Sequence, residues 1–251
     1  MTIPSATPAR TAIVTGASSG IGAAAAAALA AAGYRLLLGA RRRDRLAAVA
    51  RPLGARDLAL DVTDPDSVAA FCAEVDDLQL LVNNAGAALG LDQIDAAREE
   101  LWQDMFELNV LGVLRMTRAL LPKLRASGDG HVIVVGSTSG FEVYPGGAGY
   151  TASKHALRAV TRTLRLELLG QPVRVTEINP GLVETEFSLV RHAGDAARAA
   201  EVYRGLQPLR AQDVAECIAF AATRPPHCNV DEITLRPRDQ ASSTQIFRRE
   251  R

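Results

Sequence analysis

Short apolar segments alternate with longer segments of helical periodicity along most of the 251-residue chain. The apolar segments are nearly continuous rather than alternating apolar with polar, which is typical of strands that are buried on both faces of a parallel sheet. Seven segments are predicted to be strands: residues 11–16, 34–40, 55–62, 78–86, 131–137, 173–181 and 231–237.

Between these strands the pattern predicts helices over residues 21–32, 43–50, 65–75, 95–125, 150–169 and 211–223. Asp64 and Pro65 are typical of a helix start, whereas Gly33 and Gly170 are typical of helix ends. The β-α-β order predicts one doubly wound (Rossmann) α/β domain, with about seven parallel strands and helices on both faces. We expect this domain to span residues 1–251, with a flexible tail over 1–10 and a charged tail over 239–251.

The charge balance and the cysteines indicate what kind of molecule the protein binds and where it acts. The 28 Lys and Arg residues balance the 28 Asp and Glu residues, so we expect a small-molecule partner rather than nucleic acid or a membrane. No apolar run is long enough to cross a bilayer. Cys72, Cys217 and Cys228 are far apart, which fits a reduced, cytoplasmic protein, and their spacing predicts no metal site.

A glycine-rich turn follows the first predicted strand. The segment TGASSGIG, residues 15–22, has glycines at positions 16, 20 and 22, which let the backbone turn tightly and approach a pyrophosphate. An alanine-rich helix follows, and its N-terminus is a favourable place for phosphate groups. A glycine-rich turn between a first strand and a helix predicts a dinucleotide site.

Tyr150 and Lys154 lie four residues apart in the segment YTASK, so a helix would place them on one face. The pKa of free tyrosine is about 10, and a useful acid or base at neutral pH needs a shift of about three units, roughly 4 kcal/mol. One cation about 4 Å away supplies on the order of 4 kcal/mol at an effective dielectric constant of about 20. The pair is therefore a candidate catalytic site, although it also occurs by chance on exposed helices.

The spacing TGxxxGxG resembles that of the short-chain dehydrogenase/reductase family, and further family motifs follow in order over almost the whole chain. Ser137 precedes Tyr150 by the thirteen residues typical of the family. The other matching positions are Asp61 and Val62, the segment Asn83-Asn84-Ala85-Gly86, Asn109, Pro180 and Gly181, and Thr185.

The resemblance implies a nicotinamide-dependent oxidoreductase. Tyr150 would be the acid/base, Ser137 would bind the carbonyl oxygen, and Lys154 would lower the pKa of Tyr150 and bind the nicotinamide ribose. Asn109 would complete a proton relay through a water, although an asparagine that only kinks a long helix is also compatible. Ser139 competes with Ser137 for the serine role, but the spacing favours Ser137.

The end of the second predicted strand indicates the cofactor. A carboxylate there would bind the ribose of NAD, but the chain has Gly39 and Ala40 and then three arginines. Guanidinium groups suit a phosphate, so Arg41 and Arg42 predict NADP, whereas Arg43 and Arg45 are assigned to a solvated helix face. The predicted cofactor contacts are Gly16, Ser18, Ser19, Gly20, Ile21, Gly22, Arg41, Arg42, Asp61, Val62, Asn83, Ala85, Gly86, Tyr150, Lys154, Pro180, Gly181, Val183 and Thr185.

The segments GSTSGFEVYPGGAGY, EINPGLVETEFSLVR and RPPHCNVDEITLRPRDQ resemble the subgroup of NADP-dependent 3-hydroxy acid (serine or allo-threonine type) dehydrogenases. Reductases of aldehydes or ketones in secondary metabolism share much of the C-terminal region and remain an alternative. A substrate carboxylate would need a cation, and Arg191 is the candidate; it could instead face solvent or contact the cofactor phosphates. The resemblance also implies a homodimer or homotetramer.

Three other classes are open at this point. Nucleotide-sugar epimerases also use YxxxK, but they are usually longer and have a different glycine spacing. A cofactor-sensing regulator would keep the nucleotide loop and typically lose the tyrosine. A catalytically silent NADP-binding protein is disfavoured because Ser137, Tyr150 and Lys154 are all present.

Overall fold

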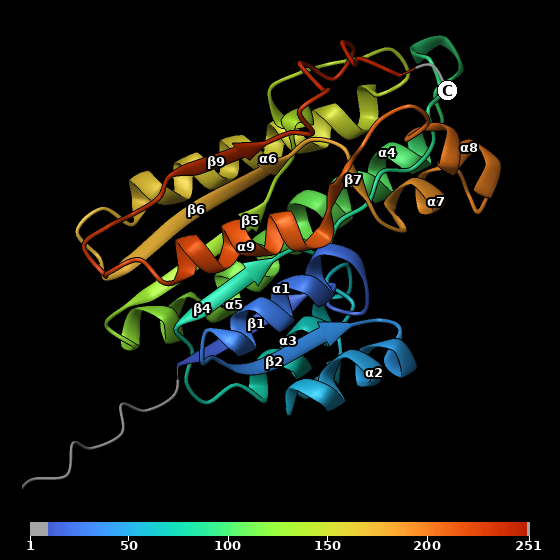
Figure 1. The fold of residues 1–251 in the computed structure, drawn as a ribbon. Helices are drawn as coiled ribbons and strands as arrows, with labels where there is room; N and C mark the ends of the chain where they lie inside the picture. The colour runs from blue at the N-terminus through green and yellow to red at the C-terminus, as the bar shows by residue number, and fades with distance from the viewer. Residues whose placement is uncertain (1–9, 250–251) are drawn as a thin grey trace, which may run out of the picture.

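The computed structural model describes residues 10–249, so the predicted N-terminal tail lies, apart from Arg10, outside the described residues. A seven-stranded parallel sheet has the order β3-β2-β1-β4-β5-β6-β9 (Figure 1). Its strands are β1 Thr11–Thr15, β2 Arg35–Ala40, β3 Arg56–Ala59, β4 Leu80–Asn83, β5 Gly130–Val135, β6 Val173–Pro180 and β9 Glu232–Leu235. Each of the seven predicted strands is confirmed.

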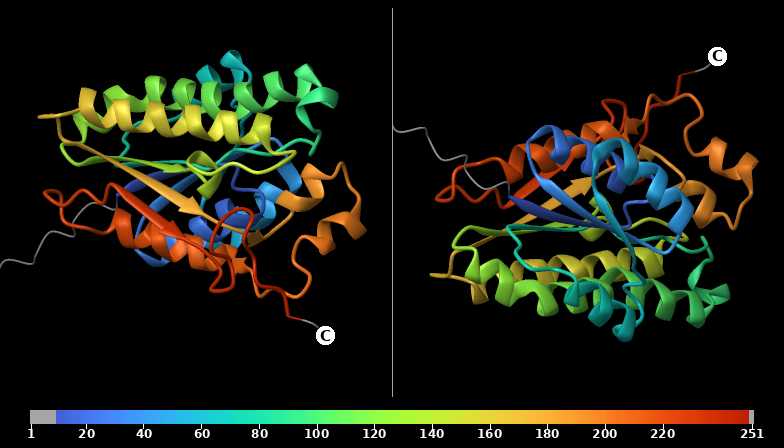
Figure 2. Two further views of the ribbon diagram at one scale, coloured as in Figure 1. Left: turned by 90° about the horizontal axis from the view of Figure 1, so that it is seen from above. Right: turned by 90° about the horizontal axis from the view of Figure 1, so that it is seen from below.

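Helices cover both faces of the sheet, and the two further views in Figure 2 show the resulting three layers. One face carries α1 Gly20–Ala31, α2 Arg43–Leu53 and α9 Ala211–Ala222. The other face carries α3 Pro65–Ala73, α5 Gly112–Ala126 and α6 Ala148–Glu167. The doubly wound domain expected from the alternating pattern is therefore confirmed.

The expected helix over residues 95–125 is divided. A short 3-10 helix, Ile94–Ala96, is followed by α4 Glu99–Phe106, a π-helical turn Glu107–Leu111 and then α5. The turn contains Asn109, whose side-chain amide donates to Ala87 O at 2.9 Å and to Ser153 Oγ at 3.0 Å. Hydrophobic periodicity continues through such a turn, so the sequence pattern gave no sign of it.

The hydrophobic pattern missed a group of short elements beyond the carboxyl end of the sheet (Figure 1). These elements are β7 Val183–Glu184, α7 Phe187–Arg191, α8 Ala196–Glu201 and β8 Leu209–Arg210. The C-terminal segment lies against them, because Arg249 N donates to Gly205 O at 2.9 Å. Elements of two to six residues are too short to show a period.

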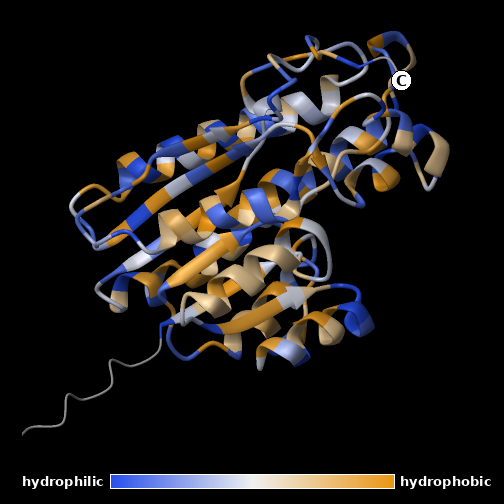
Figure 3. Cartoon of the chain, viewed as in Figure 1, coloured by the Kyte–Doolittle hydropathy of each residue, from blue (hydrophilic) through white to orange (hydrophobic). Residues whose placement is uncertain are grey.

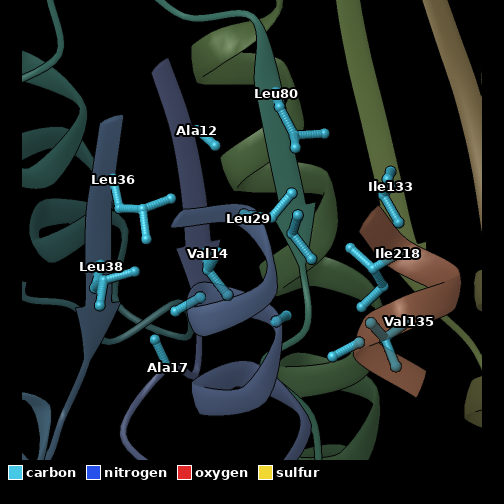
Figure 4. Packing of buried hydrophobic residues seen from close by; sticks show 14 of the residues in the cluster. Ala12, Val14, Ala17, Leu29, Leu36, Leu38, Leu80, Ile133, Val135 and Ile218 are labelled. Atoms are coloured by element: carbon cyan, nitrogen blue, oxygen red, sulfur yellow. The ribbon is translucent and has the colours of Figure 1, made fainter. Parts of the chain in front are cut away.

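Small residues let α1 pack closely against α9 and the sheet. Ala25, Ala26 and Leu29 of α1 are fully buried and belong to the cluster that includes Ile218 of α9, and Figure 4 shows Leu29 and Ile218 facing the strands. Hydrophobic residues predominate in the central strands, as Figure 3 shows. This packing holds the N-terminus of α1 at the edge of the sheet where the glycine-rich turn lies.

Within residues 10–249, the structure contains no helix that is both long and apolar enough to span a membrane. The same residues contain no group of three or more His, Cys, Asp or Glu side chains placed to hold a metal ion.

The contrast between Ala26, which is buried, and its exposed neighbour Ala27 tests this packing. Ala26→Leu should lower the free energy of unfolding by about 1–3 kcal/mol, because the added atoms overfill the closely packed cluster around Ala26. Ala27→Leu is the matched control and should stay within about 0.5 kcal/mol of the wild type. Denaturant unfolding measures both, and equal effects would contradict the close packing of α1.

Candidate active site

One pocket, about 560 Å³ in volume, lies at the carboxyl edge of the sheet. It is centred where β1 has β2 on one side and β4 on the other, the switch point at which doubly wound sheets bind ligands. Nearly all of the predicted site residues line it, and the exceptions are Gly22, Asn83 and Asn109. Residues that lie more than a hundred positions apart in the sequence therefore share one cavity.

The glycine-rich turn is fastened to the end of β4. Thr15 Oγ1 accepts hydrogen bonds from the backbone amides of Asn84 and Ala85, both at 3.0 Å. Gly16 has φ +66°, and a Cβ there would come within 2.9 Å of Ala85 Cα. A Cβ on Gly22 would come within 2.5 Å of Asn84 Nδ2. Gly22 therefore allows the turn to close, although it does not face the pocket, and the cradle that remains fits a pyrophosphate at the start of α1.

The structure separates the two asparagines after β4. Asn83 is 3% exposed and donates from Nδ2 to Thr117 Oγ1 at 3.0 Å, so its side chain joins β4 to α5. Asn84 instead lines the pocket and donates to Thr15 O at 2.8 Å. Asn83 was predicted to contact the cofactor, but its side chain lies outside the pocket, and Asn84 takes the place at the wall.

Arginines gather at one end of the pocket. Arg42 donates to Ser18 Oγ at 3.1 Å and to Ser19 Oγ at 2.6 Å, so its guanidinium group lies on the glycine-rich turn. Arg41 is largely exposed, and its Nη1 lies 3.9 Å from Asp61 Oδ2. The pocket therefore has a cationic end beside the start of α1, where a phosphate group would be favoured. Arg45, assigned from the sequence to a solvated face, is exposed, and it also pairs with Glu186 at 2.6 Å.

Tyr150 lies near the start of α6, with 7% of its surface exposed. The ring of Phe187 packs against it edge-on, with centroids 5.6 Å apart. Burial raises the pKa of the Tyr150 phenol well above its usual range, and a hydrogen bond with Ser137 opposes that rise. Ser137 lies two residues beyond β5, so β5 and α6 bring the predicted serine and tyrosine together.

Lys154 is 6% exposed, and its Nζ donates to Val135 O at 2.9 Å. Burial lowers the pKa of this ammonium group to about 8, whereas the nearby carboxylate of Glu177 acts to raise it. That Lys154 lowers the pKa of Tyr150 stays a prediction. A second cation, Arg191, acts to lower the pKa of Tyr150.

Asn109 is fully buried behind the pocket wall. Its Oδ1 accepts from Ala87 N at 3.0 Å, and its Nδ2 donates to Ser153 on α6. A Cβ on Gly86 would come within 2.9 Å of Asn109 Oδ1 and 3.8 Å of Lys154 Nζ, which places Asn109 close behind the lysine. The side chain of Asn109 therefore holds the loop after β4 against α6, which is the structural interpretation of this residue.

Arg191, at the end of α7, reaches back into the pocket. Its guanidinium carbon lies 5.2 Å from the ring centroid of Tyr144 and 5.7 Å from that of Tyr150. Nε donates to Gly90 O at 3.2 Å and Nη1 donates to Tyr144 Oη at 2.9 Å. Nη2 is buried and has no hydrogen-bond partner within residues 10–249, so it can donate a hydrogen bond to a bound ligand.

Sequence reasoning missed several residues of the pocket wall. Gln240 holds the turn after β6, because its Oε1 accepts from Leu182 N at 2.9 Å. The hydroxyl group of Tyr144 orients Arg191. These residues lie in loops with no motif of their own, so only the fold brings them to the site. The missed lining residues include Tyr144, Glu186, Phe187, His192, Tyr203, Gln240 and Ser243.

Comparisons with known proteins agree with this geometry. A sulfoacetaldehyde reductase from Chromohalobacter salexigens is 43% identical, with 92% of this chain and 94% of that protein covered. An NADP-dependent 3-hydroxy acid dehydrogenase from Schizosaccharomyces pombe is 37% identical, with 96% and 97% covered. The closed form of a serine dehydrogenase complexed with NADP+ superposes with a TM-score of 0.90 at 35% identity, with 96% of this chain and 100% of that chain covered.

The sequence model of the short chain dehydrogenase family matches residues 10–194, which hold the glycine-rich turn, Ser137, Tyr150 and Lys154. The family resemblance deduced from the motifs is thus confirmed over most of the chain. This protein is a member of the short-chain dehydrogenase/reductase family of oxidoreductases.

Proposed function

We propose that this oxidoreductase interconverts a small carbonyl compound and its alcohol, in which an anionic group is attached to the carbon next to the reacting carbon. A 3-hydroxy acid is the substrate class that the sequence predicts. One observation carries the proposal: the buried Nη2 of Arg191 has no hydrogen-bond partner within residues 10–249, and the group lies beside the ring of Tyr150. A buried guanidinium group with a free donor favours an anionic ligand.

The cofactor is NADP, in keeping with the NADP-dependent 3-hydroxy acid dehydrogenase and the NADP+ complex to which this chain is similar. The residues fit that group, because the glycine cradle suits a pyrophosphate and Arg41 and Arg42 form the cationic end of the pocket. When bound, the reduced nicotinamide supplies the hydride. No carboxylate occupies the positions of Gly39 and Ala40, where NAD-dependent relatives would bind the ribose.

The chain's own residues handle the proton. Burial keeps the phenol of Tyr150 protonated at neutral pH, so Tyr150 donates a proton to the carbonyl oxygen during reduction. Ser137 provides a hydroxyl group beside that phenol and hydrogen-bonds the same oxygen. Phe187 packs on the ring of Tyr150 and excludes water from it. In the oxidative direction Tyr150 accepts the proton, and the cations Arg191 and Lys154 favour the phenolate that this requires.

The substrates named for two relatives share one chemical feature. Sulfoacetaldehyde and a 3-hydroxy acid both carry an anion on the carbon adjacent to the one that changes oxidation state. In this chain Arg191 lies close to Tyr150, the proposed proton donor, so the same side chain can hold a carboxylate or a sulfonate while the reacting oxygen meets Tyr150. This arrangement favours acidic substrates over the neutral aldehydes and ketones of the alternative interpretation.

We also propose that the protein acts in the cytoplasm as a homodimer or homotetramer. Trp102 and Phe106 of α4 and Leu114 of α5 are 37%, 43% and 45% exposed. Large apolar side chains gathered on neighbouring elements are typical of an interface between subunits.

Removing the proton donor tests the mechanism. Tyr150→Phe should lower kcat by about two to four orders of magnitude, because a general acid contributes that much to proton transfer. NADPH binding, measured directly by fluorescence titration, should persist and serves as the control for folding. Turnover close to that of the wild type would exclude Tyr150 as the acid/base.

Removing the proposed anion partner tests the substrate class. Arg191→Met should remove a charge-assisted hydrogen bond of about 1.5–3 kcal/mol, which corresponds to a roughly 10- to 150-fold loss in kcat/KM with an acidic substrate. The loss should largely vanish with a neutral carbonyl compound of similar size. Arg198→Met changes an exposed arginine of α8, the helix that follows α7, and should leave the kcat/KM for both substrates unaffected. Equal losses for the two substrates in Arg191→Met would contradict the anionic substrate.

A further inference from the structure

Glu186 connects the segment between β7 and α7 to the cationic end of the pocket. It immediately precedes α7, and its Oε2 lies 2.7 Å from Arg42 Nη1. Its Oε1 lies 2.6 Å from Arg45 Nη1. One carboxylate therefore bridges two arginines of the segment after β2, and it does so at the mouth of the proposed cofactor site.

Arg42 is the point at which this bridge and the glycine-rich turn meet. While Nη1 pairs with Glu186, Nε and Nη2 donate to the hydroxyl groups of Ser18 and Ser19. The donors of this guanidinium group are thus divided between the turn and a carboxylate from a distant part of the chain. Hydrogen bonds from Arg42 and Arg45 also hold the pKa of Glu186 below its usual range, so the group is charged at neutral pH.

A 2′-phosphate group brings nearly two negative charges at neutral pH and needs the same arginine donors. It must either displace the carboxylate of Glu186 from Arg42 or lie beside it, and both cost binding free energy. NAD has no 2′-phosphate and does not meet this competition. The competition therefore weakens the binding of NADP but not that of NAD. Solvent reduces the size of this effect, because 41% of the Glu186 side chain and 45% of the Arg42 side chain are exposed.

We propose that Glu186 is a specificity-determining residue that competes with the 2′-phosphate of NADP for Arg42, and so limits how strongly the enzyme prefers NADP over NAD. The inference rests on the proposed assignment of the NADP site. The two roles are opposite: the arginines strengthen the binding of NADP, whereas Glu186 weakens it.

Direct binding measurements test the proposal without turnover. The dissociation constants of NADPH and NADH are measured by fluorescence titration of the wild type, Glu186→Gln and Glu184→Gln. Glu186→Gln should bind NADPH roughly three- to tenfold more tightly, the range expected for removing one or two exposed ion pairs, with NADH unchanged. The gain should shrink at high salt, because the competing charges are exposed.

Glu184→Gln is the matched control. The side chain of this exposed residue of β7 makes no hydrogen bond or ion pair within residues 10–249, so the same change of charge there should leave the ratio of the two constants at its wild-type value. An improvement that is specific to NADPH is not expected from a loosened fold, which would weaken both cofactors. Binding of NADPH by Glu186→Gln that is unchanged or weaker than in the wild type would overturn the proposal. An equal gain for NADPH and NADH would also overturn it.

Arg42→Met separates this inference from the cofactor assignment. It should weaken NADPH binding selectively, and adding Glu186→Gln to it should then have little further effect, because the contested donor is gone. A full Glu186→Gln gain in the absence of Arg42 would overturn the competition. Two results together would instead refute the NADP site itself: the wild type binds NADH as tightly as NADPH, and Arg42→Met leaves both dissociation constants unchanged.

Discussion

One buried hydrogen bond, from Lys154 Nζ to the carbonyl oxygen of Val135, fixes the geometry on which the site depends. It joins α6 to the last residue of β5, so Tyr150, one helical turn earlier, lies beside Ser137, two residues beyond the strand. Burying an ammonium group is costly. Here the cost shows in a pKa lowered to about 8, and the Glu177 carboxylate offsets part of it. The contact therefore holds Tyr150 beside Ser137 and keeps the ammonium group of Lys154 close to both.

Two cationic groups lie at different ends of the pocket, and we assign them to different ligands. Arg41 and Arg42 form the cationic end beside the glycine-rich turn, where the cofactor phosphates belong. Arg191 forms a second cationic point next to Tyr150, held there by Tyr144 and Gly90. Glu186 immediately precedes the short helix that ends at Arg191, so the segment that carries the proposed partner of the substrate anion also contacts the cofactor end of the pocket. The residues proposed for cofactor selectivity and for substrate recognition thus lie in one short stretch of chain.

The sequence predicted the sheet and the candidate residues that the fold brings to one pocket, because both rest on local signals: continuous apolar strands, a glycine spacing and the YxxxK pair. What it missed depends on distant contacts. The side chains of Asn83 and Asn84 look alike in the sequence, and only the closure of the turn decides which one faces the pocket. A second cation, Arg191, acts on Tyr150 from α7, and no local pattern indicated its place beside that ring. The ion pair between the exposed Arg45 and Glu186 was also not predicted, because the two residues lie 141 positions apart.

In the proposed reaction, a hydride passes from NADPH in this pocket to the carbonyl carbon of an acidic substrate. The most direct measurement is isotope transfer from NADPH deuterated at C4 of the nicotinamide, with sulfoacetaldehyde and a 3-oxo acid as substrates. Mass spectrometry of the product should find one deuterium on the alcohol carbon from one of the two C4-deuterated forms and none from the other. Turnover that leaves the alcohol free of deuterium with both forms, or oxidation of NADPH with neutral carbonyl compounds alone, would contradict the account.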